Sequence, residues 1–138
     1  MIRKAELMDA EAIYEILQST DDAWSMGVVE SELKSESSKA FVYVDEEGAV
    51  QGFVDIKILY DEADLMHIAA SKDMRGQGIG AKLLAKALEE AEEKPIALEV
   101  RVSNFKAISL YEKYDFKIEA RRKNYYHGED ALIMWRRK

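Results

Sequence analysis

The sequence predicts a single α+β domain over residues 1–138, built in three layers: a mixed, mostly antiparallel sheet of about seven strands flanked by about four helices. Strand and helix patterns follow one another in the order β-α-α-β-β-β-α-β-α-β-β. This order differs from the repeated βαβ units that build a parallel sheet. With 138 residues, one proline and no linker-like stretch, the chain has room for one sizeable core.

The chain begins with a short strand over residues 2–7. A helix follows over residues 9–17, because Asp9 can cap its start and apolar residues recur on one face. A second, weaker helix is predicted from Ser25, again as the cap, towards residue 35.

The middle of the chain contains the clearest hairpin. Residues 40–59 carry Val, Phe, Tyr and Ile on both sides of an EEG turn, in which Gly48 supplies a positive φ. The next strand covers residues 63–70. Residues 79–92 have the apolar spacing of an amphipathic helix, and Pro95 follows its end as a stop signal.

The last part of the chain is predicted to form a strand, a helix and a hairpin. The strand covers residues 96–100, and the helix covers residues 104–114 with an apolar stripe on one side. Residues 116–121 and 130–137 then pair as the terminal hairpin.

Composition limits the classes of function. The net charge of −7, from 27 acidic and 20 basic residues, argues against a nucleic-acid interface and suits a cationic partner such as an amine or a basic peptide, although it can also serve solubility alone. No apolar run approaches the roughly 20 residues that span a bilayer, and the N-terminus lacks the apolar stretch of a signal peptide. We therefore expect a cytoplasmic protein without membrane contact. The absence of cysteine and of an Asp–His cluster argues against a metal site.

The segment RGQGIGAKLL, residues 75–84, opens the helix predicted at 79–92. Its glycines satisfy the dinucleotide fingerprint, and Glu99 lies about 20 residues further on, which leaves that type of site open. However, five residues separate Gly76 from the preceding strand, whereas a Rossmann glycine follows its strand directly. No Gly-Lys-Ser/Thr follows, which excludes a Walker loop. Glycines and a helix start together predict a cradle for a pyrophosphate, with a plain turn as the alternative.

Residues 75–81, RGQGIGA, resemble the Arg/Gln-x-x-Gly-x-Gly/Ala signature of the GNAT superfamily of acetyl-CoA-dependent N-acetyltransferases. Three longer segments also occur in the order and spacing of one subfamily, the ribosomal-protein-alanine N-acetyltransferases often called RimI: HIAASKDMRGQGIGAKLL, LEVRVSNFKAISLYEKYDF and RRKNYYHGEDALIM. The resemblance covers residues 61–135 well and the first 60 in outline. It implies a GNAT-like acyl-CoA acyltransferase fold, acetyl-CoA as the donor, and a protein or peptide N-terminus as the acceptor.

Two side chains are candidates for proton transfer. Glu99 alternates with the apolar residues of its strand, and partial burial between helices would make it a usable base. The resemblance assigns the general-base role to the Glu of LEVR, which is Glu99, whereas an ion pair with Arg101 or Arg121 is the structural alternative. Tyr111 lies on the inward stripe of its helix, and the Tyr of LYEK is the general acid of the family. Without the resemblance, such a tyrosine is more often part of the core.

The resemblance also implies the residues that contact the donor. They are Ile68, Ala69 and Ala70 at the strand end, then Arg75, Gly76, Gln77, Gly78, Ile79, Gly80 and Ala81 in the loop, and Asn104. A backbone N–H at the strand end could hold the thioester oxygen. Asn104 also fits the N-cap of its helix, and both roles are compatible. Asp115 stands where family members usually have Gly, and Asp tolerates a positive φ better than most residues.

Trp24, Tyr125 and Tyr126 are expected to line the slot for the acceptor peptide, with ordinary hairpin packing as an equal alternative for the two tyrosines. His67 is expected to be a half-buried, hydrogen-bonded strand residue, and His127 to face solvent.

The sequence therefore predicts an N-acetyltransferase that is a monomer or a homodimer. The acceptor amine is expected to attack the thioester directly in a ternary complex. Three alternatives remain open: acetylation of a small amine or polyamine, a non-catalytic module that binds acyl-CoA, and a dinucleotide-dependent oxidoreductase.

Overall fold

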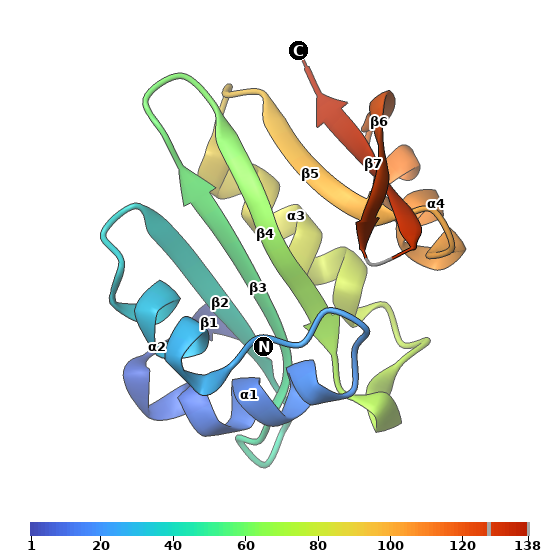
Figure 1. Cartoon of the computed structure of the whole chain (residues 1–138). Coiled ribbons are helices and arrows are strands. Elements are labelled where there is room, and N and C mark those ends of the chain that lie inside the picture. Colours follow the sequence, from blue (N-terminus) through green and yellow to red (C-terminus); the bar gives the residue numbers. More distant parts are fainter. Residues whose placement is uncertain (127, 138) are drawn as a thin grey trace.

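The computed structural model describes residues 1–126 and 128–137, and it has the three layers that the sequence predicts (Figure 1). Seven strands form one sheet in the order β1-β2-β3-β4-β5-β7-β6. Strands β4 and β5 are parallel, and the other neighbours pair antiparallel. In the part of the chain that the structure describes, no helix is long and apolar enough to cross a membrane.

The strands are β1 (Ile2–Lys4), β2 (Ser38–Val44), β3 (Val50–Ile58), β4 (Ala63–Ala70), β5 (Ile96–Arg101), β6 (Lys117–Tyr126) and β7 (Glu129–Arg136). The helices are α1 (Ala10–Gln18), α2 (Met26–Lys34), α3 (Ile79–Ala91) and α4 (Phe105–Lys113), with 3₁₀ turns η1 (Leu7–Asp9) and η2 (Lys72–Met74). The order of strands and helices is the predicted one.

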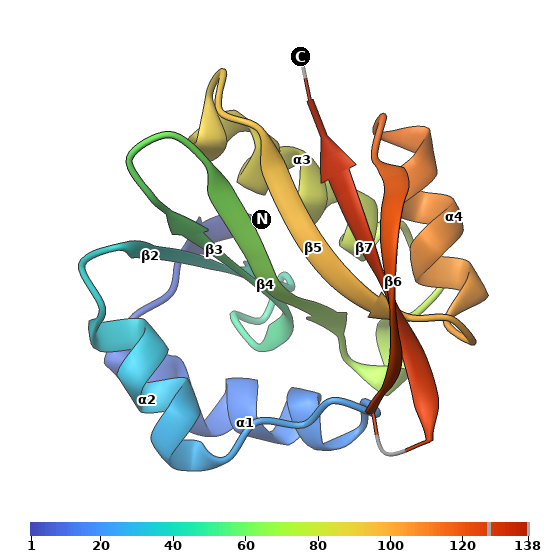
Figure 2. The same cartoon turned by 45° about the horizontal axis from the view of Figure 1, so that its top comes forward.

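Each face of the sheet has its own hydrophobic core. Helices α1 and α2 lie on one face (Figure 2), where Leu17 and Val29 meet Phe53. Helices α3 and α4 cover the other face, where Leu83 joins Val54. Phe53 and Val54 are neighbours in β3 and point to opposite faces, as the alternation of a strand requires. The sheet therefore separates two layers of helices.

The caps predicted for the starts of helices α1 and α2 are confirmed only in part. Ser25 caps α2 as predicted, because its Oγ accepts from the N–H of Val28 at 3.2 Å. Asp9 is the N-cap residue of α1, as predicted, but its side chain makes no capping hydrogen bond to that helix. The Asp9 carboxylate is instead taken up by the Arg3 guanidinium, at 2.8 and 2.9 Å, and by the N–H of Glu6, which closes the η1 turn before the helix.

The C-terminal hairpin is longer than predicted. Strand β6 continues through the segment expected to be a loop and ends at Tyr126, with Asn124 at a φ of 55° where the register with β7 shifts. Asp115 has a φ of 70°, the conformation considered for it because the family that the sequence resembles usually has Gly at this position. His127 lies outside the described residues.

A β-bulge interrupts the pairing of β3 with β4. Leu65 pairs with Ile56 and His67 pairs with Asp55, so that Met66 is an extra residue in β4. A bulge of this kind bends the strand that carries it. Met66 therefore marks the point at which β4 changes direction.

Strands β4 and β5 stay together only before this bend. Their register contains two pairs, Ala63 with Ile96 and Asp64 with Ala97. Beyond Asp64 the two strands part, and the edge of β4 that faces β5 has no partner strand there. This opening sits in the middle of the sheet, between the two layers of helices.

A buried carboxyl pair lies where α2 covers the sheet. Both carboxyl oxygens of Asp55 are inaccessible and have no donor within reach among the described residues, yet they face the Glu32 carboxyl. Two carboxyl groups can share a hydrogen bond when one of them keeps its proton. Burial, and then the neighbouring Glu32, raises the pKa of Asp55 to about 9, so Asp55 holds that proton at neutral pH. Glu32 also contacts the ammonium group of Lys57 at 3.2 Å and accepts from Ser38 Oγ at 3.0 Å.

This pair predicts a pH dependence of stability. Between the ordinary pKa of 3.8 and the folded-state pKa of about 9, folded Asp55 keeps a proton that the unfolded chain has lost, so stability falls as pH rises. Asp55→Asn keeps a donor towards Glu32 and removes this proton linkage. We expect the Tm of the variant, relative to the wild type, to increase steadily from about pH 5 to about pH 9. Thermal unfolding followed by circular dichroism measures it, and a Tm difference that is the same at every pH would contradict the assignment.

Gly52 sets the distance between α3 and the sheet. A Cβ on Gly52 of β3 would lie 2.8 Å from Cγ2 of Ile79 and 2.9 Å from Cδ1 of Leu83. Side chains in a packed interior can shift only at an energetic cost. Gly52→Ala should therefore lower the free energy of unfolding by about 1–3 kcal/mol, as measured in urea titrations. Gly27→Ala on α2 is the matched control, because the nearest atom to its Cβ would be Ser25 Oγ at 3.8 Å. Equal stability of the two variants would show that the contact is not tight.

Candidate active site

A cleft of about 740 Å³ opens where β4 and β5 part. Its walls come from the loop between α1 and α2 (residues 19–25, called the acceptor loop below), from β4, β5 and α4, and from the terminal hairpin of β6 and β7. Seven of the predicted site residues line this cleft: Trp24, Ile68, Glu99, Asn104, Tyr111, Tyr125 and Tyr126. Segments that are far apart in the chain thus meet at one opening in the sheet.

Glu99 lies in β5 on the face opposite its buried neighbours, as the alternation predicted, and its side chain is 32% exposed at the cleft. Contrary to expectation, helices do not cover this face at the level of Glu99, because β4 diverges there and α1 and α2 leave the opening uncovered. An ion-pair contact exists, but with another arginine than the two considered: Glu99 Oε1 lies 3.5 Å from Nη1 of Arg122. Tyr125 also reaches Glu99, and this hydrogen bond raises the pKa of the Tyr125 phenol.

Tyr111 reaches the same cleft from the other side of the sheet. It lies on α4, is 6% exposed, and packs its ring at 5.7 Å from that of Phe116. The residue is therefore part of the core on the α3–α4 face and also lines the cleft. Burial, and then the nearby Tyr126, raises the pKa of the Tyr111 phenol far above its ordinary value, so the phenol keeps its proton at neutral pH.

The start of α4 and the end of β4 flank these two groups. Asn104 caps α4, because its Oδ1 accepts from the N–H of Ala107 at 3.3 Å. Ile68 lines the cleft, whereas Ala69 is buried against the α1–α2 core and Ala70 ends the strand. Because β4 has no partner strand on this edge, its backbone groups there are available to a ligand.

The glycine-rich loop does not line the cleft itself but continues from β4 to α3. Gly76 and Gly78 have φ values of 85° and 78°, and Gly78 is the N-cap of the 13-residue helix α3. A Cβ at either glycine would meet nothing within 4 Å, so it is the backbone conformation that requires glycine here. The first N–H groups of a helix have no partner within the helix, and with the helix dipole they favour an anion.

Two predicted loop residues hold the loop in place. The Arg75 guanidinium donates to Oγ of Ser19 at 3.0 Å and to the carbonyl of Ala70 at 3.4 Å, which ties the loop to the end of α1 and to β4. Gln77 Nε2 lies 3.8 Å from the sulfur of Met74. The structure thus gives Arg75 an intramolecular role that its place in the signature did not indicate.

Aromatic side chains form the opposite wall. The Trp24 ring meets His67 edge to face at 5.2 Å and Phe53 at 6.1 Å. His67 is half-buried, as predicted, and its Nε2 lies 2.8 Å from the carbonyl of Asp22, so the nitrogen donates to it in the neutral ring. Burial lowers the pKa of His67, which keeps the ring neutral. Tyr125 and Tyr126 stack edge to face at 5.0 Å.

Apart from Glu99, the sequence did not single out the charged residues that line the cleft. Asp22, Glu62, Asp64 and Glu99 line it together with one arginine, Arg122, so the opening is predominantly acidic. Burial, assisted by the charge of Glu99, raises the pKa of Asp64. Part of the acidic character could have been inferred from the EADLM segment at the start of β4, but the side of the strand on which these residues lie depends on the pairing with β5.

Comparisons with known proteins agree with one another. Residues 10–116 match the profile of the acetyltransferase (GNAT) family. A Bacillus subtilis protein, provisionally named a ribosomal protein bS18-alanine N-acetyltransferase, is 36% identical over 97% of this chain and 93% of its own length. An N-alpha-acetyltransferase of Sulfolobus acidocaldarius is 34% identical over 96% of this chain and 89% of its own length. The crystal structure of the ribosomal-protein-S18-alanine N-acetyltransferase from Escherichia coli superposes with a TM-score of 0.91 at 34% identity, covering 98% of this chain and 91% of that one.

Proposed function

Because this chain belongs to the acetyltransferase (GNAT) family, we propose that it transfers the acetyl group of acetyl-CoA to the α-amino group at the N-terminus of a protein. The names of bacterial relatives point to a ribosomal protein as the acceptor, and the enzyme would then act in the cytoplasm. The observation that carries the proposal is the meeting of Glu99 and Tyr111 in one cleft, from opposite sides of the sheet.

The donor fits the α3–α4 side of the opening. The backbone conformation at Gly76 and Gly78 and the start of α3 suit a pyrophosphate, and the free edge of β4 beyond Asp64 suits an amide-containing arm. Acetyl-CoA supplies a thioester whose carbonyl carbon accepts the amine. The residues proposed to hold it are those of the strand end and the loop, 68–70 and 75–81, with Asn104 at the start of α4.

Glu99 is the proposed general base. Its carboxylate is exposed to the cleft and can take a proton from the incoming ammonium group, directly or through a water molecule. An α-amino group titrates near pH 8, so a modest base is sufficient. Arg122 and Tyr125 hold the carboxylate from the hairpin side, which fixes where the proton is taken.

Tyr111 is the proposed general acid. Its buried phenol stays protonated at neutral pH, and its O–H can donate a proton to the sulfur that leaves the thioester. Because Tyr111 belongs to the α4 side and Glu99 faces the acceptor loop, the two proton transfers occur on opposite sides of the thioester carbonyl carbon. Glu99 takes a proton from the nitrogen of the C–N bond that forms, and Tyr111 gives one to the sulfur of the C–S bond that breaks. This separation suits a direct attack within a ternary complex.

The charge of the cleft supports a cationic acceptor. Glu62, Asp64 and Glu99 surround the opening, and a protonated amine is attracted to such a field before it loses its proton. Trp24 and the two hairpin tyrosines offer flat apolar walls for the residues that follow the amine. Polyamines share the positive charge but not the need for such walls.

The acceptor can be identified with three substrates and acetyl-CoA. The first is a peptide that begins with alanine and lacks lysine; the second is the same peptide with a blocked N-terminus and one internal lysine; the third is spermidine. We expect mass spectrometry to find acetylation on the first alone. Acetylation of the lysine peptide or of spermidine, with the first peptide unmodified, would replace the proposed acceptor by a side-chain or small amine.

Replacing the two proposed catalytic groups should lower kcat. For both Glu99→Gln and Tyr111→Phe we expect a loss on the order of 100-fold, because general acid–base catalysis contributes about 10²–10⁴-fold. Acetyl-CoA binding, measured by calorimetry, should stay within about twofold of the wild type for Glu99→Gln, because the residue lies on the acceptor side. Glu119→Gln and Tyr114→Phe serve as controls outside the cleft. Wild-type kcat in either cleft variant would remove that residue from its role.

Gly78→Ala should weaken the binding of acetyl-CoA on the order of 10-fold, because a side chain at this φ strains the turn that presents the helix start. Gly48→Ala is a matched control: its φ is 84°, so it costs similar strain, but it lies in the turn between β2 and β3. Calorimetry with acetyl-CoA and thermal unfolding separate the two effects. Equal loss of acetyl-CoA affinity in both variants would refute a specific role of the loop.

A further inference from the structure

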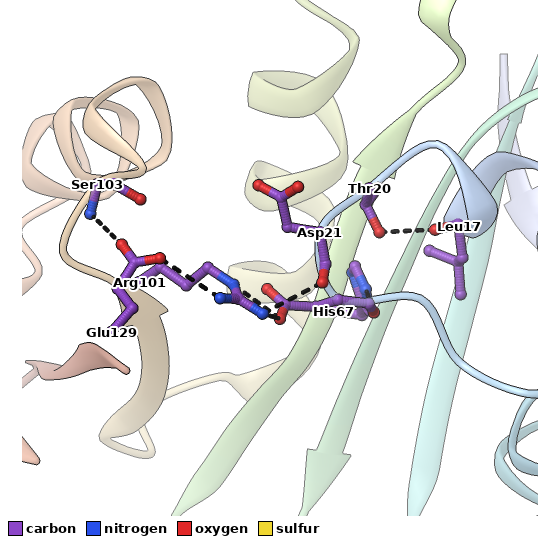
Figure 3. A network of polar contacts seen from close by, with 8 residues as sticks. Leu17, Thr20, Asp21, His67, Arg101, Ser103 and Glu129 are labelled. Carbon is purple, nitrogen blue, oxygen red and sulfur yellow. Dashed lines mark hydrogen bonds and ion pairs between the residues drawn. The ribbon is translucent and has the colours of Figure 1, made fainter. Parts of the chain in front are cut away.

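Arg101 is the last residue of β5 and lies between the two walls of the acceptor side (Figure 3). Its Nε and Nη2 donate to Oδ1 of Asp22 in the acceptor loop, at 3.0 and 2.8 Å, and Nη2 also donates to the carbonyl of Asp21 at 3.2 Å. On its other side, Nη1 donates to Oε1 of Glu129 in β7 at 3.4 Å. One guanidinium therefore bridges the acceptor loop and the terminal hairpin.

The bridge continues into the elements around it. The second carboxylate oxygen of Glu129 accepts from the N–H of Ser103 at 2.9 Å, which fixes the approach to α4 (Figure 3). On the loop side, the carbonyl of Asp22 accepts from His67 of β4. Arg101 of β5 and His67 of β4 thus attach both walls to the two central strands.

Arg101 also contacts the aromatic wall directly. Its guanidinium carbon lies 4.2 Å from the centre of the Tyr126 ring, a stacking arrangement in which the charge faces the π-system. Tyr126 lines the cleft, and so does Trp24, two residues after Asp22. The side chain of Arg101 is 20% exposed, so these contacts are made in a partly desolvated place where charge-assisted hydrogen bonds are strong.

These contacts need arginine. A guanidinium has donors on three nitrogens in a fixed plane, and here the three reach a carboxylate, a carbonyl and a second carboxylate while the plane stacks on a ring. Lysine keeps the charge but places it at one point and cannot stack in the same way. The arrangement is therefore more specific than a surface ion pair.

We propose that Arg101 is a positioning residue for the acceptor: it holds the acceptor loop and the terminal hairpin at the spacing that places the substrate amine in front of Glu99. This rests on the proposed function of the cleft. It differs from general stabilisation, because the contacts of Arg101 are with Asp22 and Glu129 on the acceptor side. The proposed donor loop, by contrast, reaches the acceptor loop at Ser19, through Arg75.

Steady-state kinetics separate these possibilities. For Arg101→Lys we expect kcat/KM for a peptide that begins with alanine to fall on the order of 10- to 100-fold, mainly through KM of the peptide, because a misplaced substrate is costly. KM of acetyl-CoA should remain within about twofold. Arg121→Lys on β6 is the matched control, since Arg121 pairs with Asp130 of the same hairpin and joins no second wall. Equal losses for peptide and acetyl-CoA would overturn the proposal.

Hydrogen–deuterium exchange tests the bridge independently of the acceptor. In Arg101→Lys, amides of residues 20–25 and 128–130 should exchange faster, while those of α3 stay unchanged. Asp22→Ala should release the acceptor loop and not the hairpin, whereas Glu129→Ala should release the hairpin and the approach to α4 at Ser103 but not the acceptor loop. Exchange that is unchanged in all three variants, or that rises throughout the chain, would overturn the proposal. If the wild-type enzyme acetylates no peptide, the proposed function fails, whereas the exchange pattern still decides whether Arg101 holds the two walls.

Discussion

In β4, Met66 has no partner across the ladder to β3, and the strand bends away from β5 at this point. This bulge is the constraint on which the site depends. It ends the pairing of the two central strands after Asp64 and opens a cleft through the middle of the sheet. It also leaves one edge of β4 unpaired, and a free edge in the interior of a sheet is unusual because buried backbone groups need partners. A bound ligand can provide them.

The two faces of the sheet surround the two candidate groups differently. The α3–α4 face has its own apolar core, and Tyr111 belongs to it, so its phenol is held by packing and stays protonated through burial. The α1–α2 face is open at the cleft, and Glu99 reaches solvent there among other carboxylates. The proposed acid and the proposed base thus lie in two environments, one apolar and one open to water. Arg101 joins the parts that the sheet itself does not connect.

Much of the fold could be read from local patterns. The helix over 79–92, the hairpin over 40–59 and the caps at Ser25 and Asn104 depend on periodicity and on nearby residues, and the structure confirms them. Predictions that depended on distant partners were less successful. The Asp9 side chain was expected to cap α1 but is taken up by Arg3. For Glu99, the alternative to a catalytic role was an ion pair with Arg101 or Arg121, whereas the arginine beside it is Arg122. Each of these outcomes depends on which strand lies next to which.

The sequence by itself determined the order of elements, the family resemblance through the loop at 75–81, and the two candidate proton-transfer residues. These follow from side-chain spacing and from motifs within a few residues. Only the tertiary structure decided that β4 bulges at Met66, that four carboxylates gather at the opening, and that Arg101 binds Asp22 and Glu129 at once. The physical reason is sequence separation: Arg101 lies 79 residues from Asp22 and 28 from Glu129, and no local pattern encodes a contact that the packing of the whole sheet creates.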